Sequence, residues 1–351
     1  MRSVDPWPAA AVLRRLPPVA RLRTDFDVEA MRSDLDLLES RTWSKIRIMT
    51  GDGLGAAATN SDWRTIPLRS IGGQASRTDP GGPDLADFAD TPRLDHLPYF
   101  QQAIGSLPHP VRSARLMALG PGARSPLHSD TKLGLPWGVV RLHVPVVTVP
   151  EATLSFGDKH YCWPAGQLWY ADFTRGHTVQ NTGALTRVHL VVDVEVSDSL
   201  IGLFPPPFIE RENIKEYLFP LPPIPLTRGP AELECDFAAP TSFLSWEALD
   251  DVFLEDASRT PVSIRQVAGE LVVFVGGKPR FGLVHVGSDE FRWAGWTTER
   301  SIQMCLYEAT PHVVLRTRRG SQAWSLVAEA RRAAEVAGDM LLAPQQAGID
   351  Q

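Results

Sequence analysis

The sequence predicts a mainly β fold, α+β overall, with a barrel or jelly-roll core. From residue 111 onward, short apolar segments that alternate like strands follow one another closely, separated by glycine and proline. The chain of 351 residues contains 30 prolines, which are excluded from helix interiors and central strands and therefore indicate many loops and edge positions. With 43% hydrophobic and 22% charged residues, the composition is that of a globular protein with one large or two modest domains.

The first part of the chain is expected to place helices beside the earliest strands. Asp27 is a candidate N-cap because it precedes apolar residues at helical spacing. In order, we expect a flexible arm (1–20), a strand (21–26), a helix (28–40), a strand (43–49), a turn or loop (51–57), a strand (62–71), a loop that could act as a lid (73–92) and a helix (97–107).

The second part is expected to contain the core strands and then a smaller domain. Core strands are predicted at 113–119, 139–147, 152–156, 167–172 and 187–196, which gives a core domain over 21–203. A proline-rich connector (204–240) follows; we favour a structural strap here over a polyproline ligand for another protein. The C-terminal α+β domain (241–351) is predicted to be a second, smaller β-rich unit. It is expected to contain a helix within 242–253 with Ser245 as a plausible N-cap, a hairpin through Gly276-Gly277, strands at 291–296, 302–307 and 312–318, and a helix (322–342).

Charge and cysteine content exclude several classes of function. The net charge of -6 argues against nucleic acid as a partner, because such surfaces normally carry a basic excess. No apolar run approaches the ~18 residues of a membrane span, and no signal peptide is recognised at the N-terminus. Three widely spaced cysteines fit a reducing compartment. We therefore expect a cytoplasmic protein that acts on small molecules or peptides.

Two histidines and an aspartate have the spacing of an iron site. His128 and Asp130 are two residues apart, so in an extended strand their side chains point to the same face. His177 is the best candidate for a second histidine. A face of two histidines and one carboxylate leaves open positions on iron(II), as oxygen activation requires. A single histidine in such a pattern is more often a core or loop residue, so the pair alone is weak evidence.

Arg187, ten residues after His177, supports this interpretation. A cosubstrate such as 2-oxoglutarate that chelates the metal buries its distal carboxylate, and a planar guanidinium suits a buried carboxylate. The charges of iron(II), Asp130, 2-oxoglutarate and Arg187 sum to zero. A substrate with its own carboxylate would then need a further cation.

The blocks H-S-D, G-V-V-R-L-H-V-P-V, G-Q-L-W-Y-A-D-F-T-R-G-H and R-V-H-L-V-V-D-V-E resemble the aspartyl/asparaginyl β-hydroxylase-type oxygenases, which depend on iron(II) and 2-oxoglutarate. Within that group they look most like bacterial L-proline cis-4-hydroxylases. The resemblance covers about residues 21–199. It implies a double-stranded β-helix, iron ligation by His128, Asp130 and His177, and binding of the distal 2-oxoglutarate carboxylate by Arg187.

Further candidates lie in the same blocks. Arg141 is predicted to hold a substrate carboxylate or to give 2-oxoglutarate a second contact, and Arg115 is a weaker candidate for the same role. For both, a surface salt bridge is the alternative. His143 and His189 share strand parity with Arg141 and Arg187 and are expected beside the pocket rather than on the metal. Trp163, Trp169 and Tyr170 either shape the pocket or belong to the core.

The resulting hypothesis is a dioxygenase that uses Fe(II), 2-oxoglutarate and O2 to hydroxylate an unactivated C–H bond. Asp130 argues against a halogenase, in which the carboxylate's coordination site must be empty. The expected substrate is a free amino acid (proline-like or Asp/Asn-type) or a residue in a peptide. The C-terminal domain could bind such a peptide or build a homodimer. The alternative is a sensor or scaffold of the same fold that binds metal and 2-oxoglutarate without turnover.

Overall fold

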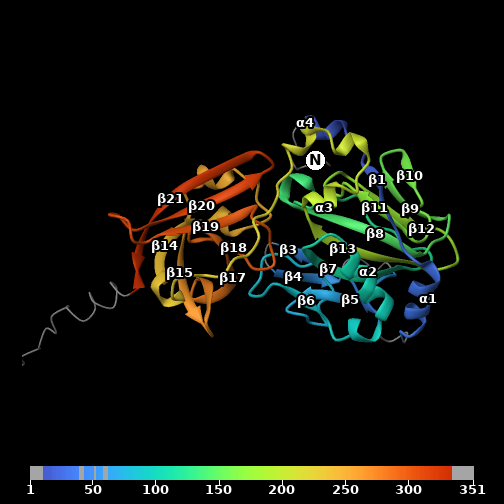
Figure 1. The fold of residues 1–351 in the computed structure, drawn as a ribbon, viewed down its shortest axis with the longest axis horizontal. Coiled ribbons are helices and arrows are strands. Elements are labelled where there is room, and N and C mark those ends of the chain that lie inside the picture. Colours follow the sequence, from blue (N-terminus) through green and yellow to red (C-terminus); the bar gives the residue numbers. More distant parts are fainter. Residues whose placement is uncertain (1–10, 39–42, 51–52, 58–61, 334–351) are drawn as a thin grey trace, which may run out of the picture. The chain divides into compact units, whose positions relative to one another are not determined.

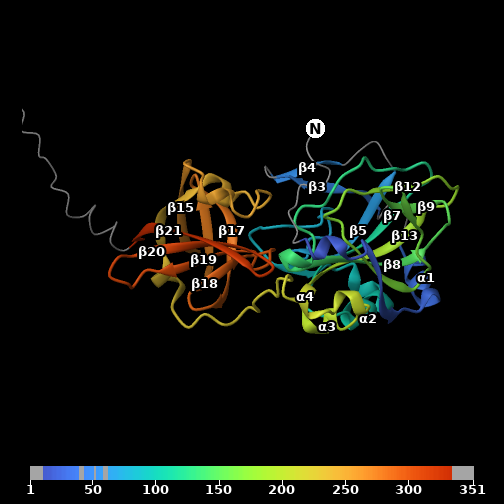
Figure 2. The ribbon, with the colours of Figure 1, turned by 90° about the horizontal axis from the view of Figure 1, so that it is seen from above.

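The computed structural model describes residues 11–38, 43–50, 53–57 and 62–333, which form two compact units (Figures 1 and 2). Unit 1 comprises residues 1–221 together with 295–299 and 318–323, and unit 2 comprises the remaining residues. The first unit therefore extends to residue 221, beyond the end at 203 that the sequence predicted.

Unit 1 is built on two antiparallel sheets, and the predicted mainly β, jelly-roll class is confirmed. The larger sheet has the order β1-β11-β8-β13-β7-β5-β2, with β6 paired to β5, and the smaller has the order β10-β9-β12. The larger sheet contains β1 (Val19–Asp25), β2 (Ser44–Lys45), β5 (Trp63–Ile71), β6 (Phe88–Asp90), β7 (Val111–Leu119), β8 (Val139–Val147), β11 (Gln167–Ala171) and β13 (Arg187–Glu195). The smaller contains β9 (Ala152–Phe156), β10 (Lys159–Tyr161) and β12 (Thr178–Asn181).

The central strands β7, β8 and β13 have two chemically different faces, because side chains alternate along a strand. Most of their even-numbered residues pack into the main apolar core; they include Ala114, Leu116, Leu142, Val144, Leu190 and Val192. Their odd-numbered residues include the buried or half-buried polar side chains of Arg115, Arg141, His143, Arg187, His189 and Asp193. On this second face Leu119 and Val139 pack with Leu154, Phe156 and Val179 of the smaller sheet. The polar side chains therefore lie on the face that meets the smaller sheet.

Helices α1 (Val28–Asp36) and α2 (Pro98–Ser106) lie side by side, as Figures 1 and 2 show. The predicted N-cap Asp27 accepts hydrogen bonds from the backbone N–H of Glu29 and Ala30. Asp34 of α1 is buried and accepts from Tyr99 N and Phe100 N, so it places a negative charge at the start of α2. Shorter helices are α3 (Asp198–Ile201), α4 (Arg211–Ile214) and the 3₁₀ turns Leu13–Arg15, Leu94–His96, Leu135–Trp137 and Pro206–Phe208. In the described residues no helix is long and apolar enough to cross a membrane.

Unit 1 departs from the sequence prediction at its two ends. Leu13 and Leu16, expected in a flexible arm, are buried in the main core; residues 1–10 lie outside the described part. In the predicted connector, Phe204 and Phe208 pack against Tyr170 with ring centroids 5.1 and 5.7 Å away. Apolar side chains thus attach both segments to the domain.

Smaller differences concern the strands before β5. The predicted strand at 43–49 is broken into β2 and β3 (Arg47–Thr50). The glycine-rich segment predicted as a turn or loop contains β4 (Gly53–Ala57), which pairs with β3; residues 51–52 lie outside the described part. Glycine lowers strand propensity, but the hydrogen bonds of this two-stranded pairing still form.

Unit 2 contains a closed barrel of consecutive antiparallel strands, β14 to β21. They are β14 (Cys235–Pro240), β15 (Arg259–Val267), β16 (Glu270–Val275), β17 (Lys278–Gly287), β18 (Glu290–Trp293), β19 (Arg300–Cys305), β20 (His312–Arg319) and β21 (Gln322–Arg332). Pairing of Cys235 with Arg332 and of Phe237 with Ala330 joins the first and last strands. The predicted hairpin through Gly276-Gly277 is the β16–β17 turn, where both glycines have positive φ.

The β-rich character predicted for this region is confirmed, but both helices predicted in it are wrong. The segment predicted as a helix from residue 322 forms β21, because pairing with β14 and β20 satisfies sheet edges that would otherwise be unpaired. Residues 334–342 of that prediction lie outside the described part. At 245–251 the chain forms turns and irregular backbone, flanked by the 3₁₀ segments Thr241–Leu244 and Val252–Leu254; a further 3₁₀ segment covers Pro230–Leu233. Phe243 and Phe253 pack together here at 5.4 Å, so tertiary packing overrides helix propensity.

Candidate metal centre

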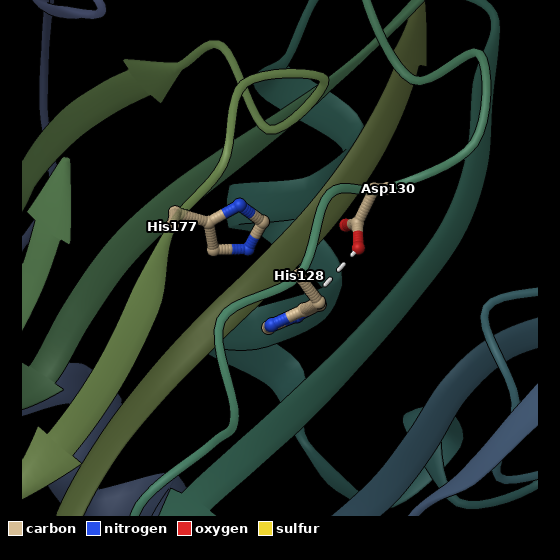
Figure 3. Close-up of side chains that lie close together, drawn as sticks. All are labelled: His128, Asp130 and His177. Atoms are coloured by element: carbon tan, nitrogen blue, oxygen red, sulfur yellow. Dashed lines mark ion pairs between the residues drawn. The ribbon is translucent and has the colours of Figure 1, made fainter. Parts of the chain in front are cut away.

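His128, Asp130 and His177 lie together, as Figure 3 shows. One ligand atom from each residue lies within 4.8 Å of the other two, and the His128 Nε2–Asp130 Oδ1 distance is 3.9 Å. The imidazole of His177 is buried, whereas His128 and Asp130 are partly exposed. The three side chains predicted from the sequence therefore converge at a place that solvent reaches from one side.

The backbone brings the two histidines together through an isolated antiparallel bridge. His177 N donates to His128 O at 2.8 Å, and His128 N donates to His177 O at 3.1 Å. Asp130 N donates to Phe173 O at 2.8 Å. His128 and Asp130 thus lie in an irregular segment rather than in the regular strand that the sequence argument assumed. The bridge to the start of β12, more than the i, i+2 spacing, sets their geometry.

The orientation of both imidazoles suits metal binding. His128 Nδ1 lies 2.9 Å from the carbonyl oxygen of Pro126, and His177 Nδ1 lies 2.9 Å from that of Arg175. With Nδ1 as the donor, the Nε2 lone pair of each ring is available to a metal. Burial lowers the pKa of His177 and outweighs the opposite effect of the Asp130 charge, which favours the neutral ring that a metal requires.

Arg141 holds the candidate carboxylate ligand in place. Its Nη1 donates to Asp130 Oδ2 at 2.6 Å, while Nε and Nη2 donate to the two oxygens of Asp193 at 2.7 and 3.0 Å. Asp193 also accepts from Ser113 Oγ at 2.8 Å and lies 3.6 Å from Nη1 of Arg115. Burial alone would raise the pKa of Asp193, but Arg141 and Arg115 hold it at about 2. Both arginines therefore form ion pairs, but in the interior of unit 1 and not at the surface, where the alternative had placed them.

A buried ion pair fixes the chain just beyond Asp130. Lys132 and Glu299 are both fully buried in unit 1, and Lys132 Nζ lies 2.7 Å from Glu299 Oε1. Trp296 Nε1 donates to the other carboxylate oxygen at 2.7 Å. Lys132 has φ +50°, a backbone conformation that is uncommon for residues other than glycine. The ion pair and the bonds to Asp130 together anchor this short segment at both ends.

Arg187 is a buried cation without a carboxylate partner in the described part of the chain. Its Nε has no hydrogen-bond acceptor there, and burial lowers its pKa to about 10. The polar atoms His143 Nε2, Trp163 Nε1 and Trp169 Nε1 likewise have no partner among these residues. Because a buried donor without an acceptor is costly, the guanidinium of Arg187 and the two indole N–H groups fit an anionic ligand such as the distal carboxylate of 2-oxoglutarate.

Ring contacts connect Trp163 and His143 to the candidate metal centre. His177 contacts Phe173 at 4.9 Å, Phe173 contacts His143 at 5.2 Å, and Trp163 lies 5.4 Å from His143. His143 Nδ1 and His189 Nδ1 are 3.2 Å apart, so the parity argument placed these two histidines correctly. Tyr170 instead packs against Phe204 and Phe208 on the apolar face of the sheet.

Sequence reasoning missed two parts of the site. Asp193 shares strand parity with Arg187 and His189, and that signal could have identified it as the partner of Arg141. Glu299 gave no such signal, because it is separated from Lys132 by 167 positions. The predicted lid segment 73–92 is mostly loop, and Arg77 joins Asp79 and Asp84 there at 2.8 Å each.

Comparison with known proteins gives one family match. Residues 26–196 match the family described as Aspartyl/Asparaginyl beta-hydroxylase, a region that includes the candidate metal ligands and Arg187. This match supports a hydroxylase-type oxygenase. A search of curated proteins found no match.

Several solved structures resemble parts of the chain. A prolyl hydroxylase from Trichoplax adhaerens, in complex with a hypoxia inducible factor peptide fragment, is 11% identical over 52% of this chain and 86% of its own, with TM-score 0.34. A 2OG-Fe(II) oxygenase family oxidoreductase from Burkholderia pseudomallei is 10% identical over 46% of this chain and 77% of its own, with TM-score 0.30. A cupin domain from Bordetella pertussis is 14% identical over 26% of this chain and 88% of its own, with TM-score 0.21.

Proposed function

We propose that this protein is a hydroxylase that depends on iron(II) and 2-oxoglutarate and acts on an amino acid, either free or within a peptide. The observation that carries the proposal is the pairing of a His-Asp-His group with a buried arginine that lacks a carboxylate partner in the described residues. A bound metal alone would explain the His-Asp-His group, whereas a metal chelated by an anionic cosubstrate would explain both this group and the buried arginine.

The donor set favours iron(II) over magnesium or calcium. Imidazole nitrogen suits iron, whereas the harder cations prefer oxygen ligands. With His128, Asp130 and His177 as ligands, half of an octahedral shell stays open for cosubstrate and oxygen. Bound iron(II) and 2-oxoglutarate would supply the oxidising power, converting C–H to C–OH with O2 while 2-oxoglutarate becomes succinate and CO2.

The protein's own residues would position the reactants and keep charge balanced. Arg141 would orient the carboxylate of Asp130, and Arg187 would hold the distal carboxylate of 2-oxoglutarate. Iron(II), Asp130, 2-oxoglutarate and Arg187 together carry no net charge. The neighbouring Arg115, Arg141 and Asp193 add one positive charge. The carboxylate of a substrate would pair with this positive charge, which favours a substrate that carries a carboxylate group, such as an amino acid, and agrees with the likeness to L-proline cis-4-hydroxylases.

The test is succinate formation by purified protein incubated with iron(II), 2-oxoglutarate and O2. Free amino acids, with proline, aspartate and asparagine first, and then short peptides are added separately. Mass spectrometry checks each for a product with one added oxygen. We expect succinate in every sample that gains oxygen, at a rate above the substrate-free background.

Two variants separate the proposed site from the rest of the protein. Asp130→Ala is expected to abolish product formation, whereas Asp158→Ala, which removes an exposed aspartate in the β9–β10 turn, should leave it unchanged. Binding of 2-oxoglutarate without succinate from any substrate would support the sensor alternative. Absence of both binding and turnover would overturn the proposal.

A further inference from the structure

A second group of metal-ligand types lies in unit 2, at the end of the β19–β20 hairpin. Cys305, the last residue of β19, pairs with His312, the first residue of β20. Opposite residues of an antiparallel ladder project to the same face, with Cβ atoms about 4.5–5.5 Å apart. Glu308 lies in the connection between them. One ligand atom from each of the three lies within 4.8 Å of the other two.

The histidine of this group is oriented for metal binding. His312 Nδ1 lies 2.9 Å from the carbonyl oxygen of Thr310. With Nδ1 as the donor, Nε2 keeps its lone pair, and a backbone carbonyl in this position is the usual outer partner of a metal-bound imidazole. Cys305 and His312 are partly buried and Glu308 is exposed, so an ion can enter from solvent.

Negative charge gathers around the sulfur. The carboxylate of Glu308 lies within 4.8 Å of the sulfur of Cys305. Arg316, on the neighbouring strand β20, forms an ion pair with Glu290 at 2.9 Å. A divalent cation at the sulfur would reduce the repulsion between these groups.

We propose that Cys305, Glu308 and His312 form a binding site for zinc or a cation of similar softness. Thiolate and imidazole ligands favour zinc and disfavour magnesium and calcium. Tetrahedral zinc with bonds of about 2.0–2.3 Å brings its ligand atoms to roughly 3.5 Å from one another, and the three atoms here already lie within 4.8 Å. Glu308 can make much of this adjustment because it is exposed and lies in a turn. The site is independent of the metal centre in unit 1 and of its proposed reaction.

Cobalt(II) provides a specific readout with the full-length protein. A thiolate bound to cobalt gives a charge-transfer absorption in the near ultraviolet, and zinc should displace the cobalt and remove it. The group of His128, Asp130 and His177 contains no sulfur, so cobalt bound there gives no such band. We expect the band in wild-type protein and its loss in Cys305→Ser.

Variants of the other two ligands test the geometry. His312→Ala and Glu308→Gln should each weaken cobalt binding by roughly ten-fold or more, as expected for loss of a ligand. Glu255→Gln, which changes an exposed glutamate elsewhere in unit 2, is the matched control and should bind as wild type. Zinc should also protect Cys305 from alkylation, while the exposed Cys162 of the same molecule stays reactive. A missing band, a band that survives Cys305→Ser, or unchanged affinity in His312→Ala would overturn the proposal.

Discussion

Replacing Arg187 by methionine is expected to stabilise the ligand-free protein and to remove its response to 2-oxoglutarate. Burial lowers the pKa of Arg187 from 12.5 to about 10. A difference of about 2.5 units at 1.36 kcal/mol per unit means that the buried charge costs ~3 kcal/mol. Because the folded pKa is the lower one, this penalty is fully present at pH 7. It is relieved only as pH rises from about 10 towards 12.5.

The same substitution should act in the opposite direction on the ligand complex. Without Arg187 the distal carboxylate of 2-oxoglutarate would be buried without its cation. Losing one partner of a buried charge pair costs ~2–5 kcal/mol, or about thirty-fold to several thousand-fold in affinity. One residue would therefore reduce stability in the free protein and supply binding energy in the complex.

Hydrogen exchange of the β7 and β13 amides measures both effects, because it reports the free energy of opening this sheet. It would be recorded anaerobically with iron(II), with and without 2-oxoglutarate. Arg32→Met is the matched control: Arg32 is exposed on α1, so the variant should change stability by less than ~0.5 kcal/mol and keep the ligand response. The reasoning fails if Arg187→Met is less stable than wild type by more than ~1 kcal/mol. It also fails if 2-oxoglutarate protects the variant as strongly as wild type.

Three further predictions concern the buried charges around the metal centre. Lys132→Met should lower the free energy of unfolding by ~3 kcal/mol or more, because the fully buried carboxylate of Glu299 loses its cation. In thermal denaturation, the double variant Lys132→Met with Glu299→Gln should lose less stability than the sum of the losses in the two single variants. The pKa of Asp193 is about 2 in the folded protein against 3.8 in the unfolded chain, so its ionised carboxylate contributes about 2 kcal/mol to stability above pH 4, and this contribution is lost as pH falls through 2. Asp193→Asn should therefore lose less stability than wild type when the protein is titrated with acid. An acid transition identical to that of wild type would contradict this. Arg141→Met should weaken metal binding roughly 10–100-fold, because Asp130 loses the donor that orients it; unchanged affinity in a cobalt titration would exclude that role.

The strands of the core could be predicted because the pattern that indicates them lies in residues that are neighbours in the sequence. In β7, β8 and β13 the side chains alternate between an apolar and a polar face, and this pattern is visible in the residues themselves. The same alternation placed Arg141, His143, Arg187 and His189 on one face. It did not show what Arg141 contacts, because Asp130 and Asp193 reach it from different segments.

The C-terminal region shows where local information failed. Residues 322–332 contain good helix formers at helical spacing, yet they form β21, because the barrel needs a strand between β20 and β14. That requirement arises from strands distant in the sequence. A helix propensity of a few tenths of a kcal/mol per residue does not outweigh a ladder of hydrogen bonds and a closed sheet.

The sequence by itself determined the β-rich class, the candidate ligands His128, Asp130 and His177, and the cation Arg187, because each depends on residue type and short spacing. Only the tertiary structure decided how the ligands are held. The bridge between His128 and His177, the bonds of Arg141 and the buried contact between Lys132 and Glu299 all join residues far apart along the chain. Charges are tolerated in the interior only when folding brings their partners together, and a single sequence does not record which partners meet.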